Sequence, residues 1–317
     1  MDSASNCLST PLFIVGPLRS GTTMLRLLMG NHPEIACFGE FECSVSQARG
    51  TSWPPLESFY EFVATDRQTK AHNFSVDKSL DYPALIKSFL AQASERNPSK
   101  IIGSSIHSRI DLLPDIWPEA KYVHILRDPR DVARSCIGMG WVGNVYHGSK
   151  YWLEPETHWD ILEGKVSEEN RITVRYEDLV RNPEAELARL CEFLGLEYDE
   201  RMLGIDENST YSRPSGDYAD QWKRKMSKRE ISWVEAVCAP MMKKRGYEIT
   251  TDTSGGVAVQ TRLSLMLQNR WYRVSNNVRR WGFLSWAQYI VLKRIGTQAQ
   301  RARIMQRIAD IQTSGLK

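Results

Sequence analysis

Short apolar runs alternate with longer amphipathic stretches along the first 250 residues. Four runs have the length and composition of buried strands, and they cover residues 11–15, 101–103, 121–126 and 171–175. Apolar positions between and after these runs recur at helical spacing. This alternation is typical of a parallel sheet with helices on both faces. We therefore predict an α/β fold built on a doubly wound parallel sheet.

Two later helices have clear end signals. Apolar residues at helical spacing fill 184–194, and Gly195 ends this helix. Ser227 and Glu230 have the spacing of a capping box, which predicts a further helix that ends in basic residues before Gly246.

The last 67 residues differ in composition from the rest. They begin with a small polar linker, Thr251–Gly256, and carry eleven Lys or Arg against two Asp. Their net charge is +9, so residues 1–250 carry −6 in a chain whose total is +3. This asymmetry predicts two parts, a domain over 1–250 and a basic, aromatic-rich helical extension over 251–317.

The basic and aromatic residues of 251–317 interleave. A basic amphipathic helix with Trp and Tyr is typical of an element that lies on an anionic membrane surface. The alternative is a helical pair that packs on the domain or on a second copy in a homodimer. Nucleic acid is a less favoured partner, because no known reader motif accompanies the charge.

The composition otherwise fits a soluble globular protein with a large core, with 42% hydrophobic and 25% charged residues. No stretch approaches the ~20 apolar residues of a transmembrane helix, and the start lacks the pattern of a signal peptide. The six cysteines and six histidines show no metal-ligand spacing. We expect a cytoplasmic protein with no metal site, peripheral at the inner membrane face if the extension binds lipid.

The strongest chemical signal is Gly-Pro-Leu-Arg-Ser-Gly-Thr-Thr at residues 16–23, directly after the first strand. Such a turn at the start of a helix leaves backbone N–H groups free to bind a phosphate-like group. A standard P-loop has lysine where this chain has Thr22; here the cation is Arg19. The fold is thus P-loop-like, and its anion site need not involve magnesium. The expected binding residues are Arg19, Ser20, Gly21, Thr22 and Thr23.

A second anion site is expected after the strand at 121–126. Arg127 ends this strand, and Asp128 and Pro129 are typical of the first positions of a helix. Ser135, two turns into that helix, can converge with Arg127 on one anion. Walker-type NTPases carry an aspartate at this strand end for Mg²⁺. Two sites built from arginine and hydroxyls indicate a nucleotide with phosphates at two separate positions.

These motifs resemble those of sulfotransferases that use 3′-phosphoadenosine 5′-phosphosulfate (PAPS). Residues 19–23 match the 5′-phosphosulfate loop in the R-S-G-T-T form of Golgi-type and many bacterial members, and Arg127 with Ser135 matches the 3′-phosphate pair. The resemblance covers about residues 11–248. It implies PAPS as co-substrate and transfer of a sulfuryl group to an acceptor hydroxyl or amine.

Two further segments resemble parts of the same family's nucleotide site. Tyr176, in Arg-Tyr-Glu-Asp-Leu, is similar to the tyrosine that lies near the adenine in these enzymes. Trp222 and Lys223 resemble the segment that closes over the nucleotide. The resemblance therefore implies that Tyr176, Trp222 and Lys223 also bind the co-substrate.

Sulfuryl transfer needs a base for the acceptor's proton, and Arg19 is expected to assist beside it. Glu40 lies 21 residues after Arg19, a spacing similar to that in tyrosylprotein and several bacterial sulfotransferases, whose glutamate here is the base. His107 lies roughly where cytosolic sulfotransferases carry their catalytic histidine. The spacing favours Glu40, whereas an ordinary pKa of about 6.5 favours His107. Both are candidates; Lys78 is a weaker candidate for a catalytic lysine.

The acceptor is open at this level, with a small molecule, a glycan and a lipid all compatible. Residues 138–148 are rich in glycine and aromatic residues, which suits either a mobile lid over the acceptor or a packed corner. Two other functions compete. A divergent P-loop kinase would want lysine at Thr22 and aspartate at Arg127; a non-catalytic adaptor at a membrane surface would bind nucleotide without transfer.

Overall fold

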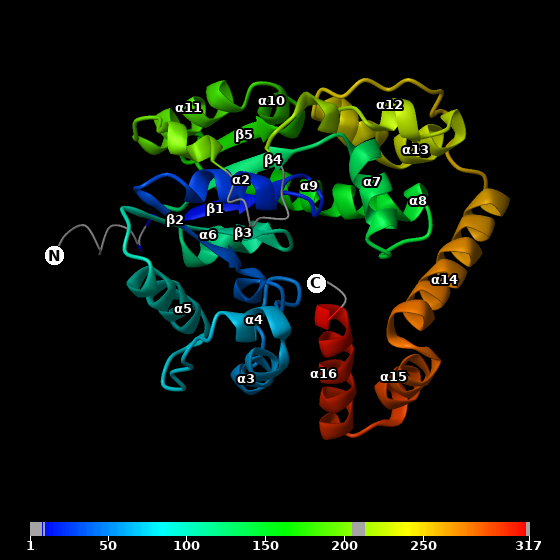
Figure 1. The fold of residues 1–317 in the computed structure, drawn as a ribbon, viewed down its shortest axis with the longest axis horizontal. Helices are drawn as coiled ribbons and strands as arrows, with labels where there is room; N and C mark the ends of the chain where they lie inside the picture. Colours follow the sequence, from blue (N-terminus) through cyan, green and yellow to red (C-terminus); the bar gives the residue numbers. More distant parts are fainter. Residues whose placement is uncertain (1–7, 9, 205–212, 315–317) are drawn as a thin grey trace.

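A computed structural model describes residue 8 and residues 10–204 and 213–314 (Figure 1). At its centre lies a five-stranded parallel sheet in the order β2-β3-β1-β4-β5. The strands are β1 (Leu12–Val15), β2 (Ile35–Glu40), β3 (Ile101–Ile106), β4 (Lys121–Leu126) and β5 (Arg171–Arg175). The predicted α/β fold with a parallel sheet is therefore confirmed.

The strand bounds agree closely with the sequence pattern except at β2 and β3. β4 and β5 begin and end where predicted, β1 begins one residue later than predicted, and β3 runs three residues further than 101–103. β2 was not predicted. It is an edge strand, is mostly half-buried, and has a register shift between Cys37 and Glu40, so it lacks a clear period-two pattern.

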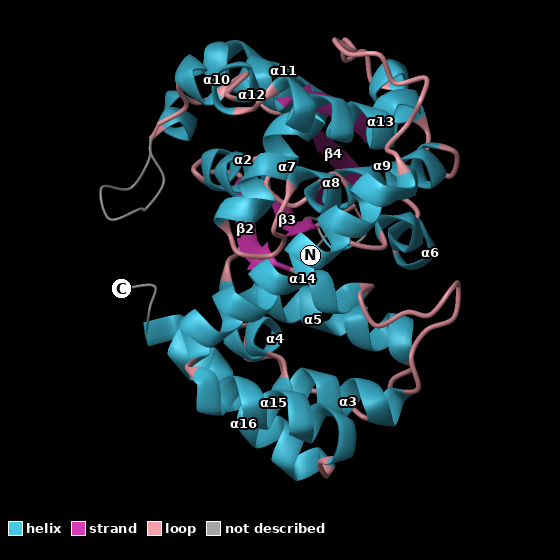
Figure 2. Ribbon diagram, turned by 90° about the vertical axis from the view of Figure 1, so that its right-hand side faces the viewer, coloured by secondary structure: helices cyan, strands magenta, loops and turns pink. Residues whose placement is uncertain are grey.

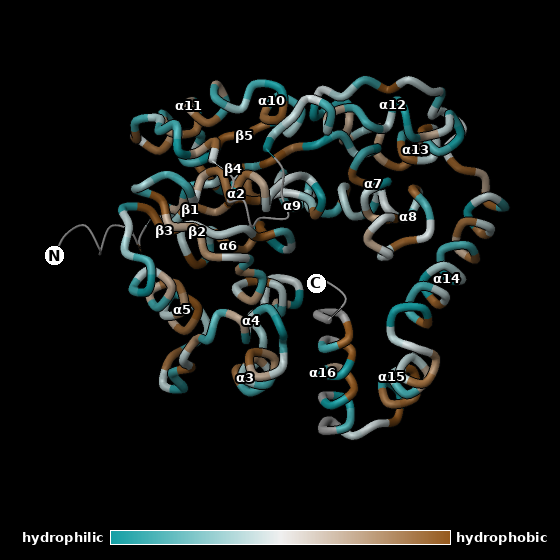
Figure 3. The backbone as a smooth tube through the Cα atoms, viewed as in Figure 1, coloured by the Kyte–Doolittle hydropathy of each residue, from teal (hydrophilic) through white to brown (hydrophobic). Residues whose placement is uncertain are grey.

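Successive residues of β1 pack against opposite faces of the sheet, and all four are fully buried. Leu12 and Ile14 contact the layer of α2 (Thr22–Gly30), α10 (Tyr176–Arg181) and α11 (Pro183–Leu194). Phe13 and Val15 contact the layer of α3 (Leu56–Thr65), α5 (Tyr82–Arg96), α6 (Leu113–Ile116) and α9 (Lys150–Glu163). Figure 2 shows the sheet between these layers, and Figure 3 shows hydrophobic residues concentrated along its strands.

A third apolar cluster lies beyond β4. It joins α7 (Pro129–Gly138), α8 (Val145–Gly148), α12 (Trp222–Lys225) and α13 (Lys228–Lys244). The capping box of Ser227 and Glu230 is present at the start of α13. Shorter elements are α4 (Arg67–Ala71), η1 (Glu42–Ser44), η2 (Ile110–Leu112), η3 (Glu168–Asn170), η4 (Glu200–Leu203) and η5 (Gly216–Tyr218).

The segment after α13 forms three helices, α14 (Val259–Trp281), α15 (Phe283–Ile295) and α16 (Gln298–Ser314). The predicted helical extension is therefore present. α15 and α16 lie at the end of the molecule opposite α10 and α11 in both views (Figures 1 and 2). Within the described residues, no helix combines the length and apolar character needed to cross a membrane.

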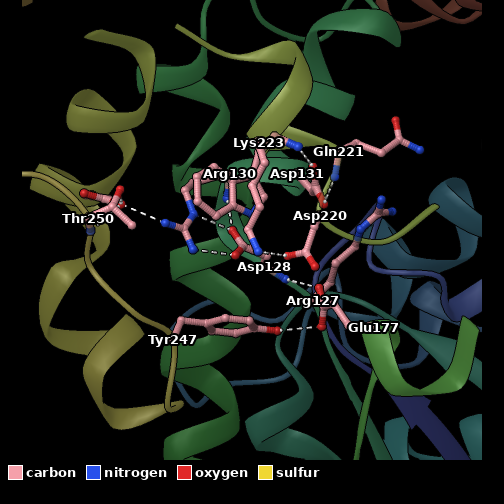
Figure 4. A network of polar contacts seen from close by, with 12 residues as sticks. Arg127, Asp128, Arg130, Asp131, Glu177, Asp220, Gln221, Lys223, Tyr247 and Thr250 are labelled. Atoms are coloured by element: carbon pink, nitrogen blue, oxygen red, sulfur yellow. Dashed lines mark hydrogen bonds and ion pairs between the residues drawn. The ribbon is translucent and has the colours of Figure 1, made fainter. Parts of the chain in front are cut away.

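A buried polar network fixes the start of α7 (Figure 4). Asp128 caps the helix by accepting from the Arg130 N–H at 2.9 Å, and its carboxylate holds the Arg130 guanidinium at 2.6 Å. The same guanidinium contacts Glu235 of α13 at 2.8 Å, and Glu235 also accepts from the backbone N–H and hydroxyl of Thr250. The network therefore ties the end of β4, and with it Arg127, to α13.

Replacing Asp128 by alanine removes a helix cap and one partner of a buried guanidinium. We expect Asp128→Ala to lower the free energy of unfolding by about 3 kcal/mol, measured by urea denaturation. The chain offers a matched control in Asp199→Ala. Asp199 holds Arg201 with the same three contacts, at 2.9, 2.9 and 2.6 Å, but at the surface, so its loss should have a much smaller effect. Equal losses of unfolding free energy in the two variants would show that burial of the Asp128–Arg130 pair does not determine its effect on stability.

Candidate functional site

The loop between β1 and α2 has the geometry of an anion cradle. Gly21 is the N-cap of α2 in the left-handed region at φ 98°, and no side chain caps the helix there. Its first N–H groups therefore remain available to a ligand. A Cβ at Gly21 would lie 2.4 Å from the Tyr176 ring, so glycine is required here. The hydroxyl of Ser20 is fully buried and has no hydrogen-bond partner among the described residues.

Arg19 links this loop to the end of β4. It adopts a left-handed conformation at φ 72°, and its Nε donates to the Ser135 hydroxyl at 3.0 Å. Arg127 donates from Nη1 to the Arg19 carbonyl at 3.0 Å. The structure thus brings together Arg19, Arg127 and Ser135, which the sequence assigned to two anion sites.

These residues line a cavity of about 470 Å³. Tyr176 forms part of its wall and stacks under the Arg127 guanidinium, whose carbon lies 4.0 Å from the ring centre. Arg127 Nε is buried and has no partner among the described residues. Asp131, Arg134 and Tyr218 also line this cavity, and the sequence did not indicate them. Gln221, which begins the segment that resembles the closing segment of the family, lines it as well. Arg134 directly precedes Ser135 on α7, and this position next to a predicted phosphate-binding residue could have identified it as a further residue of the site.

Trp222 and Lys223 lie beside this cavity but do not line it. The Trp222 ring is buried under the Arg130 guanidinium at 3.5 Å, and the backbone N–H of Trp222 donates to Asp131 at 2.7 Å. Lys223 is exposed and pairs with Asp220 at 3.4 Å. Their neighbours Gln221 and Tyr218 occupy the wall instead.

A second cavity, of about 650 Å³, lies on the other side of Arg19. Arg19, Thr22 and Thr23 form one end of it, and both candidate bases, Glu40 and His107, line it as well. Met139 and the stacked rings of Trp141 and Tyr151, 5.7 Å apart, form an aromatic wall. Arg19 is therefore common to the two cavities. Lys78 lines neither; its amine lies 5.4 Å from the Tyr60 ring centre.

Glu40 and His107 are neighbours, because β2 pairs with β3 so that Glu40 lies opposite Ser105. The His107 Nε2 lies 3.8 Å from the Glu40 carboxylate, and its Nδ1 lies 3.1 Å from the Gly16 carbonyl. The His107 side chain is 4% exposed and that of Glu40 is 30% exposed. Both residues line the cavity, but both ring nitrogens of His107 face protein groups, whereas the Glu40 side chain is the more exposed of the two.

The electrostatics of this pair follow from its contacts. The interaction with the His107 ring lowers the pKa of Glu40, and a hydrogen bond from Gln68 acts in the same direction. Burial alone would lower the pKa of His107, but Glu40 and Glu42 outweigh it and raise the pKa. Glu42 accepts from the backbone N–H of His107 and from the Ser108 hydroxyl, and burial raises the pKa of Glu42. The sequence offered no signal for Glu42 or Gln68.

The glycine-rich segment 138–148 is a packed corner. Gly140 has φ 79°, and a Cβ there would lie 2.3 Å from the Asn276 side chain of α14. A Cβ at Gly143 would lie 2.5 Å from Tyr272. These glycines allow close approach of α14, which favours the packed corner over the mobile lid.

Comparison with known proteins agrees with this geometry. A family model described as the sulfotransferase family matches residues 11–200. Protein-tyrosine sulfotransferase A of Caenorhabditis elegans is 25% identical over 272 residues, which cover 78% of this chain and 70% of that protein. Omega-hydroxy-beta-dihydromenaquinone-9 sulfotransferase Stf3 of Mycobacterium tuberculosis is 35% identical over 120 residues, but these span only 32% of this chain and 30% of that enzyme.

Solved structures support the fold. The sulfotransferase domain of the Synechococcus PCC 7002 olefin synthase has a TM-score of 0.56 at 18% identity, covering 76% of this chain and 97% of that one. The sulfotransferase domain of the curacin biosynthetic pathway has a TM-score of 0.52 at 18% identity, covering 76% and 99%. The chain belongs to the sulfotransferase family. The predicted class, a PAPS-dependent sulfotransferase, is confirmed, and neither a kinase nor a non-catalytic adaptor is favoured.

Asp131, in the wall of the arginine-lined cavity, makes the stability of the protein depend on pH. Burial raises the pKa of Asp131 from 3.8 to about 6. Between these values the folded state holds a proton that the unfolded state has lost, so this carboxyl's contribution to stability is present at low pH and lost as the pH rises through about 6.

Asp131→Asn removes this titration while keeping one acceptor oxygen for the backbone N–H of Trp222. We expect the stability of the variant relative to the wild type to rise by about 2 kcal/mol between about pH 4 and pH 7.5. Urea denaturation at both pH values measures it. A difference that does not change with pH would show that Asp131 titrates normally.

Proposed function

We propose that this enzyme transfers a sulfuryl group from PAPS to an acceptor hydroxyl across Arg19, with the donor nucleotide in the 470 Å³ cavity and the acceptor in the 650 Å³ cavity. The observation that carries the proposal is that Arg19 lines both cavities. A transferring group must lie between donor and acceptor, and Arg19 is the cation at that boundary.

On the donor side, Arg127 and Ser135 bind the 3′-phosphate, with Arg134 adding positive charge. The loop from Arg19 to Thr23 binds the 5′-phosphosulfate. The buried groups without partners fit these roles, because Arg127 Nε and the Ser20 hydroxyl are both donors suited to anionic oxygens. Tyr176 supports the Arg127 guanidinium and offers a ring face to the adenine.

On the acceptor side, Glu40 is the base and His107 is a positioning residue. PAPS supplies the sulfuryl group: the acceptor oxygen bonds to sulfur, the bond from sulfur to the 5′-phosphate oxygen breaks, and its electron pair stays on the phosphate. Glu40 takes the acceptor's proton. Arg19 and the N–H groups at the start of α2 stabilise the charge that develops on the phosphate oxygen. His107 orients the Glu40 carboxylate through its contact at 3.8 Å.

The aromatic wall of Trp141 and Tyr151 suits an acceptor with an apolar or ring-shaped body, such as a phenol, a sugar or a lipid alcohol. We also propose that the chain divides near residue 250. The residues that line the two cavities lie between Leu18 and Gln221, so this division gives chemistry to residues 1–250 and a binding role to 251–317.

Binding of the desulfated product tests the donor site. We expect adenosine 3′,5′-bisphosphate to bind without metal, and Arg127→Ala to weaken binding at least 30-fold, about 2 kcal/mol, by loss of charge-assisted hydrogen bonds. Isothermal titration calorimetry measures both. Arg201→Ala, at an exposed arginine, is the control. Preference for ATP with Mg²⁺ over the bisphosphate would sink the proposal.

Turnover separates the two candidate bases. With labelled PAPS and a panel of phenols, sugars and lipid alcohols, we expect Glu40→Gln to lose at least about 100-fold in kcat while it still binds the bisphosphate. Glu154→Gln, at another carboxylate of the same cavity, is the matched control. Full turnover by Glu40→Gln would exclude Glu40 as the base.

His107→Asn keeps a donor for the Gly16 carbonyl but removes the contact with Glu40. Because that contact lowers the pKa of Glu40, the acid limb of the pH–rate profile should move to higher pH in this variant. An acid limb at the wild-type position would show that His107 does not act on Glu40.

A further inference from the structure

Exposed apolar side chains are concentrated on the last three helices. Among the described residues, every large hydrophobic side chain counted as exposed, apart from Tyr151 and Ile161, lies between Val259 and Met305. Leu267 is 63% exposed, Trp271 71% and Ile295 81%. Figure 3 shows hydrophobic and hydrophilic positions alternating along α14 and α15. So many exposed apolar side chains on one segment are typical of an interaction surface.

The side of α14 that contacts the rest of the protein is mainly polar. Asn269 accepts from the Gly143 N–H at 2.7 Å, and the Tyr272 hydroxyl donates to the Ile137 carbonyl at 3.0 Å. Asn276 and Arg280 donate to the carbonyls of Gly140 and Met139 at 3.3 Å each.

The opposite side of α14 carries six exposed apolar residues at helical spacing, which are Val259, Leu263, Met266, Leu267, Trp271 and Val274. Leu265 is the one buried residue of the helix. The helix therefore docks by a mainly polar side and presents an apolar side outward. In a helix that packs on a protein core, the apolar side would be buried and the polar side exposed.

The charge of this surface indicates the kind of partner that it binds. Arg262, Arg270, Arg273, Arg279 and Arg280 are exposed on α14, and Lys293 and Arg294 on α15. Asp252 and Asp310 are the only acidic residues of 251–317. A symmetric dimer through this surface would bring two segments of net charge +9 together. An anionic lipid surface offers complementary charge and accepts apolar and aromatic side chains as well.

We propose that the outward faces of α14 and α15 bind an anionic membrane surface. Leu267, Trp271 and their apolar neighbours enter the interface between headgroups and acyl chains, and Arg270 and Arg273 contact the lipid phosphates. Residues 1–250, with net charge −6, are repelled by the same surface, so the charge asymmetry orients the molecule with its extension toward the lipid.

Flotation of the full-length protein with vesicles tests this directly. We expect binding to phosphatidylcholine vesicles that contain about a third phosphatidylglycerol, little binding to pure phosphatidylcholine, and release as NaCl rises. The double variant Arg270→Gln/Arg273→Gln should lose about 30-fold in affinity. Leu267→Ser/Trp271→Ser should also lose binding, because it removes the apolar anchors.

Matched controls come from elsewhere on the surface. Lys87→Gln/Lys228→Gln removes two exposed charges from residues 1–250, and Ile161→Ser removes an exposed apolar side chain; both should bind vesicles like the wild type. Titration with adenosine 3′,5′-bisphosphate reports the donor site of each variant, so failure of the donor site is read separately from failure of membrane binding.

Two outcomes would overturn the proposal. In the first, the protein does not bind the anionic vesicles, or both double variants bind them unchanged. In the second, sedimentation shows a dimer that Leu267→Ser/Trp271→Ser dissociates while vesicle binding is unaffected, which would assign this surface to a second copy of the chain.

Discussion

The contacts of Arg19 join the two halves of the site. Its guanidinium holds Ser135 on α7, its carbonyl is held by Arg127, and its backbone is kept in a left-handed conformation between them. A non-glycine residue adopts this conformation at a cost, which the surrounding contacts must offset. The constraint sets the end of the phosphate loop against the end of β4, and both cavities take their position from it.

That arrangement depends in turn on the charged network beneath it. Arg130 is held by Asp128 and Glu235, and the same aspartate caps α7 at the position next to Arg127. Buried ion pairs of this kind contribute little net stability over apolar packing, but removing one member is costly. Here they fix the position of Arg127 at the end of β4, through contacts that extend to Thr250.

Much of the fold and of the candidate site could be predicted from the sequence, because the strongest signals are local. The apolar run of β4, the cap and proline of α7, and the glycines of the phosphate loop each specify their own backbone. The relation between Glu40 and His107 could not be predicted in this way. The sequence offered them as alternative bases, yet the pairing of β2 with β3 places them in contact. The register between two strands cannot be read from either strand alone. Trp222 and Lys223 were assigned by resemblance, but the turn before them brings Tyr218 and Gln221 to the wall instead.

The glycines of the segment Gly138–Gly148 carry a consequence for the acceptor site. α14 holds this segment through Met139 and Gly140, and holds the preceding residue, Ile137, as well. Met139 also lines the 650 Å³ cavity that we propose for the acceptor. One stretch of chain is thus shared by an external surface and a substrate wall. By thermodynamic reciprocity, a partner on α14 whose affinity changes when the acceptor binds must change acceptor affinity by the same factor. Because Ile137 and Gly138 also line the arginine-lined cavity, such a partner would act on both cavities.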